Sequence, residues 1–482
     1  MSAPISFDNS YSRLPDAFFS RQSLQPVSDP ALIQVNPDLA ATLEIDADWL
    51  TSNTAIEAFS GNIALPGSDP IATVYAGFQF GNFNPQLGDG RALLLGEVVT
   101  KTQRYDIQLK GSGATAFSRG GDGRSPLGPV LREYLVSEAM AALGVPTTRS
   151  LVAIATGDSV QREGIEPGGI LTRVAQSHIR FGTFQYFSAR QDNHSLRQLA
   201  DYVITRHFPQ LSAQANPYEG LLETVIDNVA RLISHWQCLG FIHGVMNTDN
   251  MLITGETVDY GPCAFMDRFK YDTVYSAIDQ GARYAFQNQP SIAHWNLMTF
   301  AQALLPLIDD QPDQAIAIAK ARLDEFPDRF DTYWRARSAA KLGLMPSKIS
   351  AQLYSEFLQL LENHGLDFTL SFAALREAFS TPPTFGKDPA WHDWWTRWQE
   401  EIGATSSLEQ AQARMTKANP TLIPRNHQIE FAIAEAYENG TYDRFSGLLA
   451  AVTDPFNPDL AKTAFALAPK PDEIVRRTFC GT

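Results

Sequence analysis

The sequence predicts an α+β protein in two parts, a strand-rich part followed by a largely helical part. Apolar residues between 92 and 109 follow a strand pattern, whereas those between 222 and 239 recur at helical spacing. The chain has 482 residues, which is too long for one small core. A two-lobed enzyme, or two to three domains, is therefore expected.

The strand-rich part begins with a hairpin. Ala92–Val99 is apolar, Thr100–Arg104 is polar and Tyr105–Leu109 alternates, which predicts two paired strands ending at Lys110. The glycine-dense stretch Gly111–Gly123 follows and matches neither a Walker A motif nor a dinucleotide fingerprint. Its glycines allow close backbone approach to phosphate, and a plain flexible loop is the competing interpretation.

One helix and two further strands complete this part. Pro129–Leu143 has helical spacing, and Gly144 and Pro146 end the helix as a cap and a breaker. Leu151–Thr156 and Gly169–Val174 are the two predicted strands. The order of strands, helix and strands indicates a small α+β lobe.

The helical part begins at about residue 190. A strong apolar stripe over 222–239 predicts a long helix that leads directly into His243. Residues 295–482 are predicted to be mostly helical, with proline-rich breaks near 376–390 and 419–424. Residues 1–70 mix Pro, Ser and Asp with short apolar stretches, and their pattern assigns no elements.

Four tryptophans fall on one helical face, and a core or docking face is the favoured interpretation over a binding platform. They are Trp391, Trp394, Trp395 and Trp398.

Charge and composition exclude several classes of protein. The net charge of −15 disfavours a general nucleic-acid binder. Three cysteines give no disulfide framework, and neither a signal peptide nor an apolar run of membrane-spanning length is evident. A cytoplasmic protein without a membrane partner is expected.

The pair Lys110 and Glu133 is the first candidate for chemistry. Lys110 ends a predicted strand, and Glu133 lies in the first turns of the next helix. In protein kinases a strand lysine holds phosphates while a helix glutamate orients it. Alone, the pair is a weak signal, and a solvated helix face would be the favoured interpretation.

The segment from His243 to Gly261 strengthens this interpretation. Asn250 and Asp259 have the order of the kinase residues that hold Mg²⁺, which prefers oxygen ligands; Mn²⁺ is the alternative metal. An Asn/Asp-rich turn without metal is the competing interpretation. With Lys110 and Glu133 upstream, the ordered motifs favour a two-lobed, protein kinase-like fold with a helical C-terminal lobe and extension.

One position departs from the kinase pattern. The base of a kinase lies five residues before the metal-binding Asn, where this chain has Val245, which cannot accept a proton. Asp249 is the nearest carboxylate that could replace it. The missing base leaves open a nucleotide-binding scaffold without catalysis.

Six strings of the chain resemble the selenoprotein O family, and the resemblance covers nearly the whole sequence. Cys480 stands where eukaryotic members carry selenocysteine. The strings are Gln86–Ala92, Ile107–Gly113, Ser118–Arg124, His243–Met251, Asp259–Pro262 and Thr478–Thr482.

The resemblance implies a kinase-like enzyme that binds ATP in reversed orientation and transfers AMP to Ser, Thr or Tyr hydroxyls of proteins. A monomer is expected, and conventional phosphotransfer is the alternative reaction. The implied roles are an ion pair of Lys110 and Glu133, a nucleotide lining of Gly88, Gly90, Arg91, Asp122 and Gly123, phosphate ligands Arg173 and Arg180, metal ligands Asn250 and Asp259, and the base Asp249.

The reversed orientation has a physical logic. Attack at the α-phosphorus expels pyrophosphate, so charge builds on the β- and γ-phosphates and donors should gather there. Arg suits this task because its planar fork binds phosphate oxygens in pairs. From spacing alone, Arg173 and Arg180 would be assigned to surface salt bridges.

The resemblance also raises a redox question. In relatives a C-terminal Cys can form a regulatory disulfide with a Cys of the activation segment, yet residues 264–290 contain no Cys. Cys263 is a candidate substitute for that partner, and a free thiol or no role for Cys480 stays open.

The expected division of the chain has four parts. They are an N-terminal extension packing on the lobes (1–70), a kinase-like N-lobe (71–185), a C-lobe with the catalytic loop (186–300) and a helical extension with the Cys-containing tail (301–482).

Overall fold

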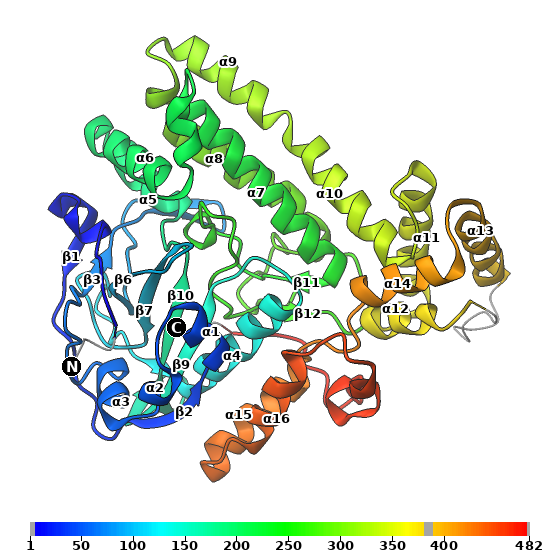
Figure 1. The fold of residues 1–482 in the computed structure, drawn as a ribbon, viewed down its shortest axis with the longest axis horizontal. Helices are drawn as coiled ribbons and strands as arrows, with labels where there is room; N and C mark the ends of the chain where they lie inside the picture. Colours follow the sequence, from blue (N-terminus) through cyan, green and yellow to red (C-terminus); the bar gives the residue numbers. More distant parts are fainter. Residues whose placement is uncertain (1–4, 380–388, 480–482) are drawn as a thin grey trace.

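An antiparallel sheet forms the N-terminal part of the protein. The computed structural model describes residues 5–379 and 389–479. The sheet has eight strands in the order β1-β3-β6-β7-β10-β9-β2, with β8 pairing β10 (Figure 1). The strands are β1 (Phe19–Arg21), β2 (Ala31–Val35), β3 (Ile71–Thr73), β6 (Ala92–Val99), β7 (Arg104–Lys110), β8 (Ser125–Pro126), β9 (Arg149–Gln161) and β10 (Ile165–Ala175).

The predicted hairpin and helix are confirmed. β6 and β7 pair in antiparallel fashion with Ala92 opposite Lys110, and helix α4 spans Leu127–Ala142. The two following strands are also confirmed, but both are longer than predicted. β9 continues to Gln161 and β10 begins at Ile165, because the polar turn between the two predicted strands extends the pairing instead of ending it.

Residues before 70 supply both edges of the sheet. β1 pairs with β3 at one edge, and β2 pairs with β9 at the other. Three short helices, α1 (Pro37–Thr42), α2 (Ala47–Leu50) and α3 (Asn53–Phe59), follow β2. Their apolar residues, such as Leu50 and Phe59, share a core with Ile107 and Leu151 of the sheet.

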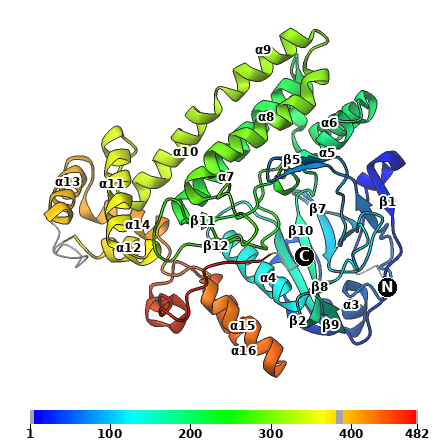
Figure 2. The ribbon, with the colours of Figure 1, turned by 180° about the vertical axis from the view of Figure 1, so that it is seen from behind.

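The rest of the chain is largely helical, as predicted, and α7 and α8 lie beside the outer helices α9 and α10 (Figures 1 and 2). The helices are α5 (Phe181–Ser188), α6 (Asn193–His207), α7 (Pro217–Leu239), α8 (Gln289–Ile308), α9 (Pro312–Leu323), α10 (Phe326–Lys341), α11 (Lys348–His364), α12 (Phe368–Arg376), α13 (Pro389–Thr405), α14 (Leu408–Ala418), α15 (Asn426–Asn439) and α16 (Asp443–Val452).

Short elements complete the structure. The strands are β4 (Gly77–Gln79), β5 (Asn82–Asn84), β11 (Phe241–Ile242) and β12 (Ala264–Phe265). The 3₁₀ turns are η1 (Tyr11–Arg13), η2 (Asp16–Phe18), η3 (Pro209–Ala213), η4 (Thr248–Asn250), η5 (Phe286–Asn288), η6 (Pro458–Lys462) and η7 (Ala464–Ala466). Within residues 5–379 and 389–479, no helix combines the length and apolarity that a bilayer crossing needs.

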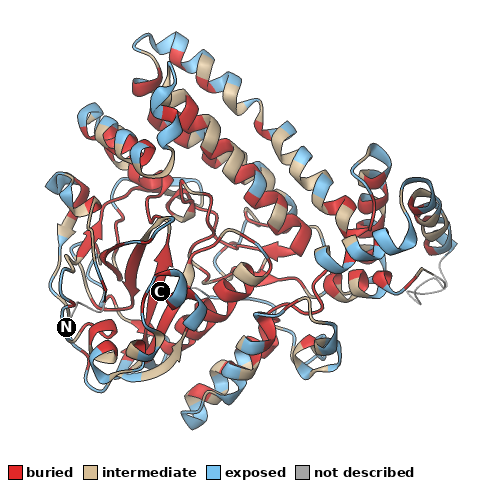
Figure 3. Cartoon of the chain, in the orientation of Figure 1, coloured by how far each residue is buried: buried red, intermediate tan, exposed pale blue. Residues whose placement is uncertain are grey.

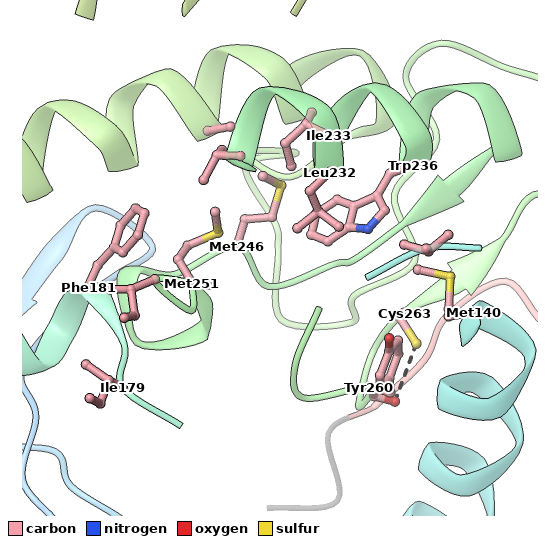
Figure 4. Packing of buried hydrophobic residues seen from close by; sticks show 14 of the residues in the cluster. Met140, Ile179, Phe181, Leu232, Ile233, Trp236, Met246, Met251, Tyr260 and Cys263 are labelled. Carbon is pink, nitrogen blue, oxygen red and sulfur yellow. Dashed lines mark hydrogen bonds between the residues drawn. The ribbon is translucent and has the colours of Figure 1, made fainter. Parts of the chain in front are cut away.

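Helix α7 begins and ends with standard signals. The side chain of Asn216 caps its first turn, Pro217 occupies the first position, and Gly240 ends it with φ 67°. Its buried stripe packs on the segment that follows β11, where Met246 and Met251 lie between Phe181 and the helix (Figure 4). This core holds the loop after His243 in place.

The tryptophan face of α13 is part of a buried core, which confirms the core interpretation. Trp394 and Trp398 donate their indole N–H groups to Leu353 O and Leu342 O, both at 2.8 Å. Burial concentrates on this face while the outer turns of α13 and α14 are exposed (Figure 3).

The predicted helix breaks also agree where they are described. α12 ends at Arg376 and α14 ends at Ala418, while residues 380–388 of the first break lie outside the described residues. Cys480 lies outside them too. The preceding Thr478 donates its hydroxyl to Pro262 O at 2.6 Å and its amide to Tyr275 O at 2.8 Å. The end of the described chain therefore packs beside Cys263, which is buried.

Replacing Trp398 by Ala should lower the free energy of unfolding by about 3–5 kcal/mol, because the indole is fully buried and its loss leaves a cavity. Urea unfolding followed by circular dichroism measures this loss. His392→Ala on the exposed face of α13 is the control and should change stability by about 0.5 kcal/mol or less. Equal losses in the two variants would contradict the assignment of Trp398 to the core.

Candidate functional site

The candidate site lies where the sheet meets the loop that follows α7. Gln108, Lys110 and Arg173 share one face of the sheet, because Arg173 of β10 lies opposite Gln108 of β7 and alternate residues of a strand face the same way. Glu133 comes from α4, and Asp259 follows the loop. Residues distant in sequence thus meet at one place.

A network of buried charges joins these residues. The carboxylate of Asp259 accepts from Lys110 at 3.0 Å, Arg173 at 2.7 Å and Arg180 at 3.1 Å. Glu133 accepts from Lys110 at 2.5 Å and from Arg173 at 2.6 Å. Three cations therefore surround two carboxylates, and the surface salt bridges considered for the two arginines are ruled out because both are almost fully buried.

The cations decide the protonation of the network. Burial alone would raise the pKa of Asp259, but Arg173, Lys110 and Arg180 hold that pKa well below its usual range. Glu133 behaves in the same way: burial opposes ionisation, and Arg173 and Lys110 lower its pKa. Both carboxylates are ionised at neutral pH.

Contacts from His243 hold the backbone next to Asp259 in place. Asp259 has φ 64°, in the left-handed region that non-glycine residues rarely adopt. His243 Nε2 donates to Val258 O at 2.8 Å, and its ring stacks on Trp236 with centroids 5.3 Å apart. Burial lowers the pKa of His243, so the ring is neutral. These contacts give His243 a structural role behind the loop.

Asp249 lies on η4 next to the charge network. Its main-chain oxygen accepts from Arg180 at 2.5 Å, and its Oδ2 accepts from Gln79 at 3.2 Å. The other carboxylate oxygen is buried and has no hydrogen-bond partner among the described residues. Burial raises the pKa of Asp249 to about 6, so this carboxyl group binds a proton more readily than an exposed one.

The β4–β5 hairpin covers this carboxylate. A Cβ atom at Gly77 would lie 2.6 Å from Asp249 Oδ1, so only glycine fits against it. Phe78 N donates to Thr248 Oγ1 at 2.8 Å, and Phe80 N donates to Asn247 Oδ1 at 3.1 Å. The first strand of the hairpin, β4, is thus docked on the loop.

The oxygen atoms of the loop fit a hard divalent cation. Asn250 donates its amide nitrogen to Val245 O at 3.0 Å, so its amide oxygen is the atom left for a ligand. The partnerless oxygen of Asp249 and the carboxylate of Asp259 belong to the same donor type. The described residues hold no cluster of three or more His, Cys, Asp or Glu side chains. Mg²⁺ commonly takes one or two protein oxygen ligands and completes its shell with water and phosphate, so the amide oxygen of Asn250 and the carboxylate of Asp259 fit it by donor type.

The glycines of the predicted nucleotide lining pack tightly. A Cβ at Gly88, where φ is 76°, would lie 2.4 Å from the ring of Phe117. A Cβ at Gly90 would lie 2.9 Å from Phe117 O. The carbonyl of Arg91 accepts a hydrogen bond of 2.7 Å from Gly111 N. The positive charge of Arg91 contributes to the lowered pKa of Asp259. This turn therefore lies beside the charge network.

Asp122 and Gly123 are held elsewhere. Asp122 accepts two hydrogen bonds of 3.0 Å from Arg162 in the turn between β9 and β10. Gly123, with φ 65°, packs its Cα against the backbone of Gly113. The structure joins Lys110, Glu133, Arg173, Arg180, Asp249 and Asp259 directly, and it pairs Asp122 outside that group.

Sequence patterns missed several residues of the site. Asp89 accepts from Thr73 N and Oγ1, and its other oxygen lies 3.8 Å from Arg180. Tyr75 lies under the Arg180 guanidinium, 4.6 Å from the ring centroid. Asp89 could have been found because it stands between Gly88 and Gly90. Tyr75 and Gln79 gave no signal, because the segment that carries them, from the end of β3 to the end of β4, contains no motif.

Comparison with known proteins gives a consistent result. Residues 2–453 match the family model described as "Protein adenylyltransferase SelO". The chain is 49% identical to "Protein nucleotidyltransferase YdiU" of Nitrobacter hamburgensis, covering all of this chain and 97% of that protein. It is 51% identical to the protein of the same name from Rhodopseudomonas palustris (strain BisB5), with full coverage of both chains.

Replacing Arg173 by Met should lower the free energy of unfolding by about 3–5 kcal/mol, because Glu133 and Asp259 would lose a buried partner. Urea unfolding measures the change. Arg397→Met, which breaks an exposed pair with Glu356, is the control and should cost about 0–1 kcal/mol. A loss for Arg173→Met no larger than for the control would show that the buried network does not depend on this guanidinium.

Proposed function

Because the chain belongs to the SelO family of protein adenylyltransferases, we propose that its buried charge network holds ATP with the β- and γ-phosphates inward and the α-phosphate toward Asp249. The chain is a protein nucleotidyltransferase. Its substrates are ATP and a protein.

We also propose that the fold is kinase-like and two-lobed. The sheet with α4 would be the N-lobe, within 71–185, and the helices from 186 to 300 would carry the catalytic loop. The pair Lys110 and Glu133 supports this proposal, since a strand lysine bound to a helix glutamate is the arrangement that positions phosphates in kinases. Residues 1–70 would be an extension that packs on the lobes, and 301–482 a helical extension of the C-lobe.

The proposed reaction is an in-line displacement at the α-phosphorus. The oxygen of a Ser, Thr or Tyr hydroxyl forms a bond to that phosphorus, and the bond to the bridging oxygen of pyrophosphate breaks. Asp249 accepts the hydroxyl proton. A carboxylate whose pKa is raised by burial is a better proton acceptor than an exposed one, because its basicity is higher.

The arginines have the charge and rigidity that pyrophosphate departure requires. Negative charge develops on the β- and γ-phosphates, and fixed cations in a buried site stabilise it strongly. Asp259 pairs with Arg173, Arg180 and Lys110. Glu133 pairs with Arg173 and Lys110. These groups need little rearrangement to meet phosphate oxygens.

Asn250 and Asp259 would hold Mg²⁺, which would neutralise phosphate charge when bound. The side chain of Asn250 is oriented for this by its bond to Val245 O. Gly88 and Gly90 would let the backbone approach the nucleotide closely, and Arg91 would add positive charge beside it.

Val245 is the observation that favours AMP transfer over phosphate transfer. It occupies the place of the kinase base, it is buried and apolar, and its N–H donates to His243. The only carboxylate on the adjacent turn is Asp249, which approaches from a different direction. Phosphotransfer in the kinase manner would lack its base.

ATP labelled at the α-phosphate should transfer its label to protein, whereas ATP labelled at the γ-phosphate should not. The reason is that pyrophosphate is the leaving group. Intact-protein mass spectrometry should show adducts of AMP mass and no phosphate adducts. Transfer of the γ-label alone would overturn the proposal in favour of a phosphotransferase. Transfer of neither label, with ATP bound, would leave a nucleotide-binding scaffold.

Asp249→Asn should lower kcat for AMP transfer by about 10²–10⁴-fold with a small change in the Kd for ATP, because it removes a proton acceptor and keeps the shape. Asp324→Asn, which alters an exposed carboxylate paired with Lys320 at the end of α9, is the matched control and should stay within about threefold of the wild type. Kinetics of α-label transfer measure both. Comparable activity of Asp249→Asn and the wild type would exclude Asp249 as the base.

A further inference from the structure

A cavity of about 490 Å³ lies away from the nucleotide site. It opens where the last turns of α7 meet α10 and α14, which pack against one another. Leu143, at the end of α4, and Phe456 close its sides. None of the residues that join the charge network around Asp259 lines it, so the cavity is not part of that network.

The cavity is strongly cationic. Arg337, Lys341, Arg414 and Lys417 line it, and no Asp or Glu is among the described residues that do so. The whole chain carries a net charge of −15, which makes four cations without a carboxylate unusual on its surface. Arg414 is held in place by two hydrogen bonds to Gly343 O, at 2.8 and 2.9 Å.

Lys341 is a buried lysine without an anionic partner among the described residues. Only 3% of the residue is exposed, and no carboxylate of the described residues pairs with its ammonium. Its ammonium lies 4.0 Å from the ring centroid of Phe372, which offsets only part of the cost of burial. Lysines are almost never fully buried without a partner, and burial lowers the pKa of this one to about 7.

Arg337 lies one helical turn before Lys341 on the same face of α10. Like charges at this spacing repel each other, so the pair weakens the helix unless an anion separates them. Its Nε is buried and has no hydrogen-bond partner among the described residues. The carboxylates of the described chain do not supply that anion. Arg337 and Lys341 therefore present two unsatisfied donors to the same space.

We propose that this cavity binds a small organic anion, a phosphate or carboxylate attached to an apolar body. The oxyanion contacts Lys341 and Arg337, since ammonium and guanidinium groups recognise phosphate and carboxylate by charge-assisted hydrogen bonds. The apolar body lies along Leu143, Leu239 and Phe456. A volume of about 490 Å³ falls in the range of small-molecule sites, roughly 300–1,000 Å³.

The proposal does not depend on the reaction at the nucleotide site. It rests on the cavity, on the absence of lining carboxylates in the described chain and on the unpaired ammonium. Both sites can be tested independently, because residues of the first are not residues of the second.

Binding of phenyl phosphate, octanoate and inorganic phosphate to the full-length protein tests the proposal, with octanol as the neutral comparison. Calorimetry gives affinities, and the rise in Tm with concentration follows by mass action. Lys341→Met and Arg337→Gln should each weaken binding of phenyl phosphate or octanoate at least tenfold. We expect no binding of octanol, because it carries no negative charge.

Two further variants distinguish binding in this cavity from binding elsewhere on the protein. Arg180→Ala disrupts the nucleotide site, and Lys320→Met removes an exposed cation on α9. Both variants should bind the organic anions as the wild type does. If Lys341→Met does not fold, the loss of affinity in Arg337→Gln tests the proposal alone. Absence of binding for both organic anions, or equal binding in wild type and in Arg337→Gln, would overturn the proposal. Binding of inorganic phosphate alone would overturn the organic part of it.

Discussion

The structure of the site depends on the carboxylate of Asp259. It accepts from a strand lysine, a strand arginine and an arginine at the start of α5, and thereby ties β7, β10 and the loop after α7 to one point. Removing such a charge from water is costly unless it is fully paired, and this one is. The unusual φ of Asp259 is maintained because three cations and the backbone bond from His243 determine its position.

The second constraint is the position of α4. Arg132 on this helix donates to Asn426 at 3.1 Å and pairs with Glu430, while Gly128 N donates to the hydroxyl of Tyr437 at 3.0 Å. α15 thus braces the helix that carries Glu133. The C-terminal helices contribute to the site indirectly, because they fix the helix whose glutamate orients Lys110 and Arg173.

Sequence reasoning predicted the elements whose patterns are local. The β6–β7 hairpin, α4 and α7 carry alternation, helical spacing and caps, and all three are present. The edge strands β1 and β2 and the β4–β5 hairpin were missed, because strands of three to five residues hold too little pattern. Pairing partners far along the chain select β1 and β2. Gln79 was missed for the same reason, because its role comes from its contact with Asp249, which no spacing reveals. Asp89 stands between Gly88 and Gly90, but its contact with Arg180 appears only in the structure.

The rigidity of the charge network has a consequence for affinity. A free Lys or Arg side chain loses about 1.5–2 kcal/mol of rotamer entropy when a contact immobilises it. Lys110, Arg173 and Arg180 are already immobilised by carboxylates in the folded chain, so that entropy is lost during folding and not during nucleotide binding. In the proposed binding mode, an incoming triphosphate exchanges one set of oxygen partners for another. Its affinity then reflects the balance of enthalpies between carboxylate and phosphate more than the ordering of flexible side chains.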